Sequence, residues 1–254
     1  MNAAVTAEVV GRAGVITVNR PDALNALTYD VVRTIAQQFD TWRDDQHVHG
    51  VVITGAGDRA FAAGADITEL QRKRVPEMTD TGMQHWMTAI RESPLPSIAA
   101  VSGFALGGGF ELALACDIRI ATPASKFGFP ETGLGIIPGA GGTQLLSRYA
   151  GVSVANYHVL TGALMSAERA HQLGLVSELH EPAALRDAAI ALVETMAGRG
   201  PLALRLAKRA IRASSDTSLA AGLEIELLAQ AALFGTEERD EGLAAFIGKR
   251  QPDF

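Results

Sequence analysis

The chain has 254 residues, of which 48% are hydrophobic and 20% charged, and its net charge is −6. This composition predicts one large core with an appendage, and the acidic excess argues against a nucleic-acid partner. No uncharged apolar run reaches the ~18 residues of a membrane span. The start, "MNAAVTAEVV", lacks a basic region and a signal-peptide core, so we expect a cytoplasmic location. The single cysteine, Cys116, excludes an intramolecular disulfide and is expected in the core.

The first half of the chain predicts strands that alternate with helices. "AEVVGRAGVITVNRP" indicates a hairpin, and the apolar period after Thr28 predicts a helix. "HGVVITG" is expected to be a buried strand, and "PEMTDTGMQHWMTAIRES" a helix. Two more short strands, "PSIAAVSG" and "DIRIAT", flank an apolar helix in "GGGFELALA". This rhythm is typical of α/β layering.

The composition shifts toward helices after Pro138. Helices are expected in "GGTQLLSRYAG", from Val152 to Leu160 and in "SAERAHQLG", with one last strand in "LVSELH". Four further helices are expected at about 183–197, 201–213, 217–234 and 237–248. We therefore divide the chain into an α/β core, residues 1–195, and a helical region, residues 196–254, that packs on its own body or on a neighbouring subunit.

One motif suggests a nucleotide site but fails in its context. "VVITGAGDRA" fits the dinucleotide pattern G-x-G-x-x-A after a strand. That site needs a helix to begin within the motif, and Gly64 in the following "FAAGAD" interrupts any such helix. A nicotinamide cofactor is not expected.

Two turns rich in small residues combine features that suit a reactive site. "FAAGADITEL" and "ALGGGFELA" each place small residues just before a helix. Backbone N–H groups at a helix start lack partners, and small residues let another molecule approach them. If the two turns are adjacent, each could donate one N–H to a single oxygen, as in an oxyanion hole. For either turn alone, a tight turn where backbones pack closely is the favoured explanation.

Two glutamates strengthen the functional interpretation. Glu111 lies one helical turn beyond Gly108, and Glu131 stands in the apolar stretch "FGFPETGLGIIPG". Each alone could cap a helix or pair with an arginine. Together, near such a pair of turns, they suggest acid–base chemistry on a polarised carbonyl compound. Apolar surroundings would raise the pKa of a glutamate there.

Other chemistries have less support in the sequence. The six histidines are scattered without a metal-site spacing, so no metal is expected. A G-x-S-x-G elbow and a P-loop are absent, and Ser102 has no evident base partner.

The blocks "FAAGADITEL", "GFALGGGFELALACDIRIA" and "FGFPETGLGIIPGAGGTQLL" resemble the signature blocks of the crotonase, or enoyl-CoA hydratase/isomerase, superfamily. The resemblance runs from "NRPDALNAL" to "AFIGKR", in the family's order and spacing. It implies a spiral of β-β-α turns followed by a helical trimerisation region. It also implies an acyl-CoA thioester substrate, no cofactor other than the coenzyme A of the substrate, and a homotrimer or a hexamer built as a dimer of trimers.

The resemblance also implies roles for individual residues. The oxyanion-hole amides match Ala65 and Gly108. The two hydratase carboxylates match Glu111, which would activate water, and Glu131, which would protonate C2; their separation of 20 positions agrees with the hydratase pattern. Further positions are implied to contact substrate or coenzyme A, namely Ala63, Asp66, Ile67, Thr68, Gly139, Phe246 and Lys249, with Gly139 orienting the second carboxylate and the last two often acting across a subunit boundary.

Three positions depart from the hydratase pattern. Thr68 stands where a lysine is common, so one contact to the coenzyme A phosphates is in doubt. Phe110 and Phe129 are bulky for their places beside the glutamates, and we expect them to narrow the acyl pocket.

The first functional hypothesis is therefore hydration of a trans-2-enoyl-CoA to the 3-hydroxyacyl-CoA, a step of fatty-acid β-oxidation. A double-bond isomerase of the same fold is the alternative, although family isomerases commonly use one carboxylate near position 131. The third hypothesis is a non-catalytic acyl-CoA-binding protein, which would not need both glutamates.

Overall fold

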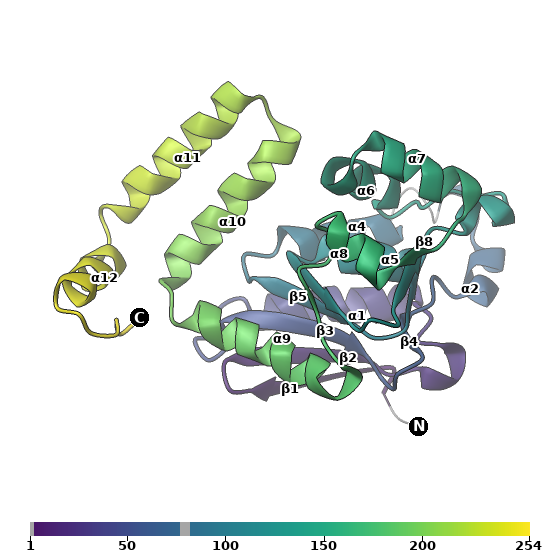
Figure 1. Cartoon of the computed structure of the whole chain (residues 1–254), viewed down its shortest axis with the longest axis horizontal. Coiled ribbons are helices and arrows are strands. Elements are labelled where there is room, and N and C mark those ends of the chain that lie inside the picture. Colours follow the sequence, from purple (N-terminus) through teal and green to yellow (C-terminus); the bar gives the residue numbers. More distant parts are fainter. Residues whose placement is uncertain (1–2, 77–81) are drawn as a thin grey trace.

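The computed structural model describes residues 3–76 and 82–254, and two sheets organise its body (Figure 1). The larger sheet has six strands in the order β1-β2-β3-β5-β7-β10, in which β1 is antiparallel to β2 and the other neighbours are parallel. The strands are β1 (Val5–Val10), β2 (Ala13–Val18), β3 (Gly50–Gly55), β5 (Ser97–Val101), β7 (Ile118–Ala121) and β10 (Glu178–Leu179).

The smaller sheet has four very short strands in the order β4-β6-β8-β9, of which only β8 and β9 are antiparallel. They are β4 (Ala60–Ala62), β6 (Phe104–Leu106), β8 (Lys126–Gly128) and β9 (Met165–Ser166). The chain passes from the large sheet to the small one three times, as β3-β4, β5-β6 and β7-β8. This repeated β-β unit confirms the expected spiral. None of the four strands of the small sheet was predicted from the sequence.

Helices cover both faces of the large sheet because successive strand residues point to opposite sides. Val52 and Ile98 pack with Leu185 and Val193 of α9, whereas Val51 and Ile53 belong to the main core on the other face. The body helices are α1 (Tyr29–Trp42), α2 (Ile67–Arg72), α4 (Met83–Glu92), α5 (Gly108–Ala115), α6 (Gly142–Ala150), α7 (Val152–Thr161), α8 (Ala167–Gln172) and α9 (Pro182–Ala197).

Several predicted boundaries agree with the structure, and others differ. The Thr28 side chain caps α1 by accepting from the Val31 N–H. The helix predicted over 76–93 is present as α4, but residues 77–81 of that prediction lie outside the described residues. The strand predicted in "LVSELH" shortens to the two residues of β10, because Leu175 and Val176 pack in the core instead.

Three helices project from the body: α10 (Pro201–Asp216), α11 (Leu219–Leu233) and α12 (Glu237–Ile247) (Figure 1). Helix α10 is tied to the body at Asp117, which pairs with Lys208 at 2.7 Å and with Arg212 at 2.9 Å. No single helix among the described residues is long and apolar enough to span a bilayer, and only the bent pair α11 and α12 passes that test together.

Candidate active site

The first glycine turn is built against the loop of residues 20–27. The Ala63 N–H donates to the Leu24 oxygen, the Leu27 N–H to the Gly64 oxygen, and the Asp66 N–H to the Leu27 oxygen, at 2.8–3.0 Å. Among the described residues, no acceptor is found for the Ala65 N–H in this turn. The turn thus fixes the backbone on both sides of an amide that remains available.

Asn25 anchors that supporting loop. Its side chain is buried, donates to the Ala56 and Ala60 oxygens, and accepts from the Arg20 N–H. Leu24 and Asn25 both have positive φ, 49° and 57°, a conformation that costs energy for residues other than glycine. The three side-chain hydrogen bonds of Asn25 hold this backbone in place.

The second turn needs glycine for two separate reasons. Gly107 has φ 50° and ψ −125°, and a Cβ there would lie 2.4 Å from Glu131 Oε1. A Cβ on Gly109 would lie 1.9 Å from the Ala62 oxygen, so the start of α5 lies directly against β4. Gly108 is the first residue of α5, where N–H groups have no partner within the helix.

These two turns lie side by side. A Cβ built on Gly108 would be 3.5 Å from the Ala65 nitrogen and 3.6 Å from the Met83 sulfur. The amides of Ala65 and Gly108, 43 positions apart in the sequence, therefore come from adjacent turns.

Glu111 is buried and held by the backbone. Its side chain is 3% exposed, and Oε1 accepts the N–H groups of Ala140 at 2.7 Å and Gly142 at 2.9 Å. Desolvation raises the pKa of this carboxyl, and the two N–H groups oppose the rise because they favour the ionised form. The arrangement fixes one oxygen of the carboxylate in a single orientation.

Glu131 is in a different environment. It is 9% exposed, begins the short 3₁₀ helix Glu131–Leu134, and lies against Gly107. Burial raises its pKa to about 7, to which the charge of nearby Glu111 also contributes. Its Oε2 atom is buried without a hydrogen-bond partner among the described residues. An oxygen of this kind is free to exchange a proton with a bound molecule.

The other residues predicted to contact substrate at the first turn differ in exposure and in their partners. Ala63, Ile67 and Thr68 flank the first turn, and the side chains of the last two are exposed. Asp66 caps α2 and pairs with Arg20 at 2.9 Å, a contact that lowers the pKa of the Asp66 carboxyl. Arg20 at this turn was not predicted, although it lies in "NRPDALNAL".

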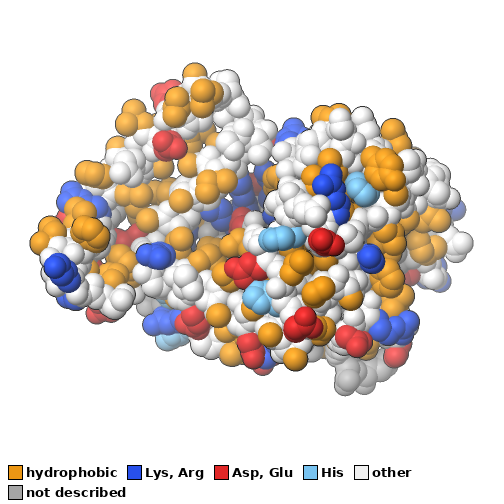
Figure 2. Space-filling model, in the orientation of Figure 1, with side chains coloured by type: hydrophobic (Ala, Val, Ile, Leu, Met, Phe, Trp, Pro, Cys, Tyr) orange, Lys and Arg blue, Asp and Glu red, His pale blue; other side chains and the backbone are white. Residues whose placement is uncertain are grey.

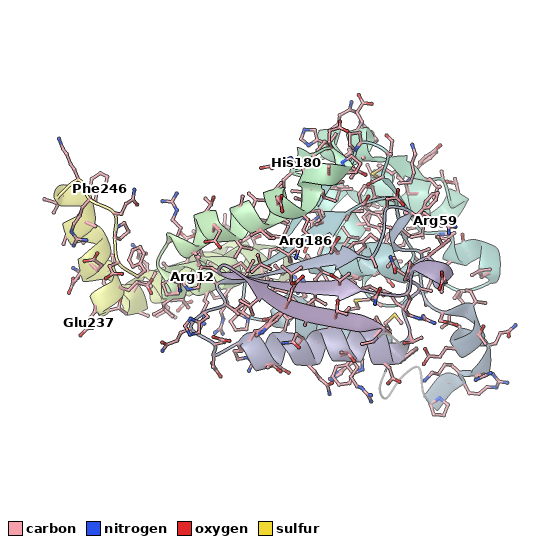
Figure 3. All side chains as sticks on the ribbon, turned by 90° about the horizontal axis from the view of Figure 1, so that it is seen from below. Arg12, Arg59, His180, Arg186, Glu237 and Phe246 are labelled. Carbon is pink, nitrogen blue, oxygen red and sulfur yellow. The ribbon has the colours of Figure 1, made fainter. Side chains whose placement is uncertain are left out.

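Phe246 and Lys249 are not brought to the site within one chain. Phe246 is 84% exposed on α12, at the opposite end of the molecule from Arg59, which precedes the strand leading to the first turn (Figure 3). Lys249 is also exposed and follows α12.

One expectation about this region requires correction, and another stays a prediction. Phe110 and Phe129 do not narrow a pocket: both are fully buried in the core, with ring centroids 4.9 Å apart, and Phe129 packs beneath Gly142. The N–H groups of Ala140 and Gly142 orient the Glu111 carboxylate. The glycine run "PGAGG" just before α6 carried this signal, because helix starts supply free N–H groups. The expected role of Gly139 in orienting Glu131 stays a prediction.

The described residues contain no cluster of His, Cys, Asp and Glu that could hold a metal ion.

A model of the family enoyl-CoA hydratase/isomerase matches residues 10–254. The chain belongs to this family. The match covers the α/β body and the projecting helices alike, as the sequence resemblance implied.

Individual family members are similar to this chain over nearly their whole length. The short-chain-enoyl-CoA hydratase of Clostridium acetobutylicum is 39% identical over 249 residues, 97% of this chain and 95% of that protein. The 2,3-dehydroadipyl-CoA hydratase of Escherichia coli is 43% identical over 244 residues, 96% and 95% of the two chains. The crystal structure of an enoyl-CoA hydratase from Bacillus anthracis superposes with a TM-score of 0.94 at 37% identity, covering 99% of both chains.

Proposed function

We propose that the chain hydrates trans-2-enoyl-CoA thioesters to 3-hydroxyacyl-CoA, at a site formed by the Ala65 and Gly108 amides and the carboxyls of Glu111 and Glu131. The observation that carries the proposal is the contrast between two buried carboxyls beside these amides. One is fixed by two N–H groups, and the other keeps a free oxygen and a pKa of about 7. Similarity to named enoyl-CoA hydratases supports the same reaction.

In the proposed mechanism the two amides bind the thioester oxygen. Donors aimed at a developing oxyanion are worth about 3 kcal/mol or more each in the transition state. They withdraw electrons from the conjugated double bond and make C3 electrophilic. The close packing of Gly108 on Ala65 supports this arrangement.

The carboxyls then move two protons. Desolvation raises the pKa of Glu111, and its two backbone donors oppose that rise. In its carboxylate form Glu111 accepts a proton from water as the water oxygen bonds to C3. Glu131, which holds a proton near neutrality, donates it to C2. Glu111 ends protonated and Glu131 ionised, and proton exchange with solvent restores both before the next turnover. The sum is the addition of one water, and it neither oxidises nor reduces the substrate. The proposal therefore assigns coenzyme A to the substrate and no separate cofactor to the enzyme.

Contacts to the coenzyme A portion extend the proposal. Ala63, Asp66, Ile67 and Thr68 would border the pantetheine path on one subunit, and Gly139 would lie near the reacting end. Phe246 and Lys249 would be supplied by a neighbouring copy.

The proposed assembly is a homotrimer, or a dimer of trimers, formed through residues 196–254. Apolar side chains are exposed along the projecting helices, as the orange side chains on that arm show in Figure 2. They include Leu219, Leu223, Leu227, Leu228, Phe234, Leu243, Phe246 and Ile247. Exposed apolar area of this extent is typical of an interface, and a monomer by light scattering at micromolar concentration would contradict the assembly.

Product identification tests the function. Crotonyl-CoA should lose its enoyl thioester absorbance and gain the mass of one water. An unchanged mass with a moved double bond, tested with a 3-enoyl-CoA as well, would instead establish an isomerase. Tight binding without turnover would refute both and leave an acyl-CoA-binding protein.

A further inference from the structure

A cavity of about 190 Å³ lies behind the candidate site, between α4, α6 and the end of α10. Its walls include Met87, Ala115 and Ala140 on the inner side. Gln84, Thr88 and Gln144 form part of its outer rim, where all three are exposed. The cavity therefore opens to solvent at one end and reaches the buried core at the other.

Three segments of the chain border both this cavity and the candidate site. Met83 lies beside Gly108, and Met87, one turn further along α4, lines the cavity. Ala115 lies one turn beyond Glu111 on α5, and a helix rises about 1.5 Å per residue, so the cavity is about two turns from Gly108. Ala140 lines the cavity and donates its N–H to Glu111. An acyl chain extending past Glu111 along α4 and α5 would arrive there.

The charges at this cavity are unusual for an acyl pocket. Two guanidinium groups, Arg91 and Arg148, and one carboxylate, Asp216, line it. The ion pairs of this cluster are formed by Arg91, so within the described ranges the positive charge that is left without a carboxylate partner lies on Arg148. The Arg91 side chain is only 16% exposed; it pairs with Glu92 at 2.7 Å and with Asp216 at 3.5 Å, and its buried Nε has no hydrogen-bond partner among the described residues.

Arg148 is the less neutralised of the two cations. Its hydrogen bonds go to the Ser215 oxygen and to the backbone and side-chain oxygens of Gln144, all of which are uncharged. In the part of the chain that the structure describes, no carboxylate pairs with it. A bare hydrocarbon tail would gain little from such a lining, whereas a terminal carboxylate would find planar donors suited to it.

We infer that this cavity is a subsite for the distal end of the acyl chain and that it selects short 2-enoyl-CoA substrates carrying a terminal carboxylate. This inference rests on the proposed hydratase function and names its substrate class. Arg91 and Arg148 are the specificity-determining residues, and Asp216 opposes them.

The test compares two substrates of equal length. The kcat/KM for hydration is measured with a six-carbon trans-2-enoyl-CoA bearing a terminal carboxylate and with trans-2-hexenoyl-CoA, and crotonyl-CoA serves as the reference. The carboxylate substrate is expected to be preferred by at least about fivefold, the discrimination of a partly exposed charge-assisted hydrogen bond. Added salt should reduce the ratio because the cavity is open to solvent.

Two variants with opposite expected effects strengthen the test. Arg148→Gln should remove most of the preference, and Asp216→Asn should increase it. A purely structural role would not move the ratio in opposite directions. Arg186→Gln is the matched control, since Arg186 is an exposed arginine paired with Glu8 on the opposite sheet surface, away from this cavity.

Each outcome decides the matter. A ratio of the two kcat/KM values, carboxylate substrate over trans-2-hexenoyl-CoA, at or below one would overturn the subsite, and so would a ratio that neither variant changes. Hydration of crotonyl-CoA in the same experiment would still support the proposed function. No hydration of any of the three substrates would refute the proposed function, and the inference with it.

Discussion

Replacing Glu131 by glutamine should stabilise the protein while removing activity. The pKa of this carboxyl is about 7 in the folded chain, against an ordinary value of 4.5. The folded state therefore retains a proton that the unfolded state releases, and stability falls as the pH rises from about 4.5 to about 7. At about 1.4 kcal/mol per pH unit, ionised Glu131 costs the folded state about 3 kcal/mol above that window.

Glutamine has nearly the same shape and cannot ionise, so Glu131→Gln removes this cost. Any packing or hydrogen-bonding change caused by the amide is the same at every pH, and the change with pH isolates the ionisation. Between pH 5 and pH 8 the advantage of the variant should grow by about 2.5 kcal/mol.

Urea unfolding of both proteins at the two pH values, at one protein concentration, measures this difference. Glu168→Gln, which removes an exposed carboxylate on α8, is the matched control. A difference in unfolding free energy between Glu131→Gln and the parent that is equal at pH 5 and pH 8 would refute the reasoning from burial.

Three further predictions concern the reaction and its scaffold. Glu111→Gln should lower kcat on crotonyl-CoA by ~10²–10⁴-fold with little change in coenzyme A affinity; near-native turnover would remove Glu111 from the mechanism. The kcat/KM of the parent should fall above about pH 7 as Glu131 loses its proton, and a profile that stays level to higher pH would contradict its role as the acid. Gly107→Ala should cost roughly 1–3 kcal/mol of stability from the positive φ alone, and it should reduce turnover by pushing Glu131 aside. The control is Gly133→Ala, because the space around Gly133 is open. Equal stability and turnover of the two variants would show that Gly107 does not position Glu131.

Local patterns predicted the longer elements well because their causes lie within the segment. Helix α1 follows from the Thr28 cap and the apolar spacing of Val31, Ile35 and Phe39. Strand β3 follows from a continuous apolar run that is buried on both faces.

The small sheet was missed because its strands have only two or three residues, too few for an alternating pattern. Pairing with neighbours far along the chain, not local preference, extends these segments. Ala62 illustrates the cause, since its place against Gly109 is set by tertiary packing.

The candidate site divides in the same way. Glu111, Glu131 and the two glycine turns were recognisable as side-chain and backbone chemistry within short stretches of sequence. The hydrogen bonds from Ala140 and Gly142 to Glu111 join residues 29 and 31 positions apart, so the sequence alone could not assign them to this carboxylate. The sequence could not show that the Phe110 side chain points into the core. Every residue of α5 is buried, so the helix has no polar face from which the direction of a side chain could be predicted.

The most direct test of the account is a crystal structure of the Glu131→Gln variant with crotonyl-CoA bound. We predict the thioester oxygen at about 2.7–3.1 Å from the backbone nitrogens of both Ala65 and Gly108, with C2 facing residue 131 and C3 facing Glu111. A thioester oxygen bound to any other group, or both side chains on the same carbon, would contradict it.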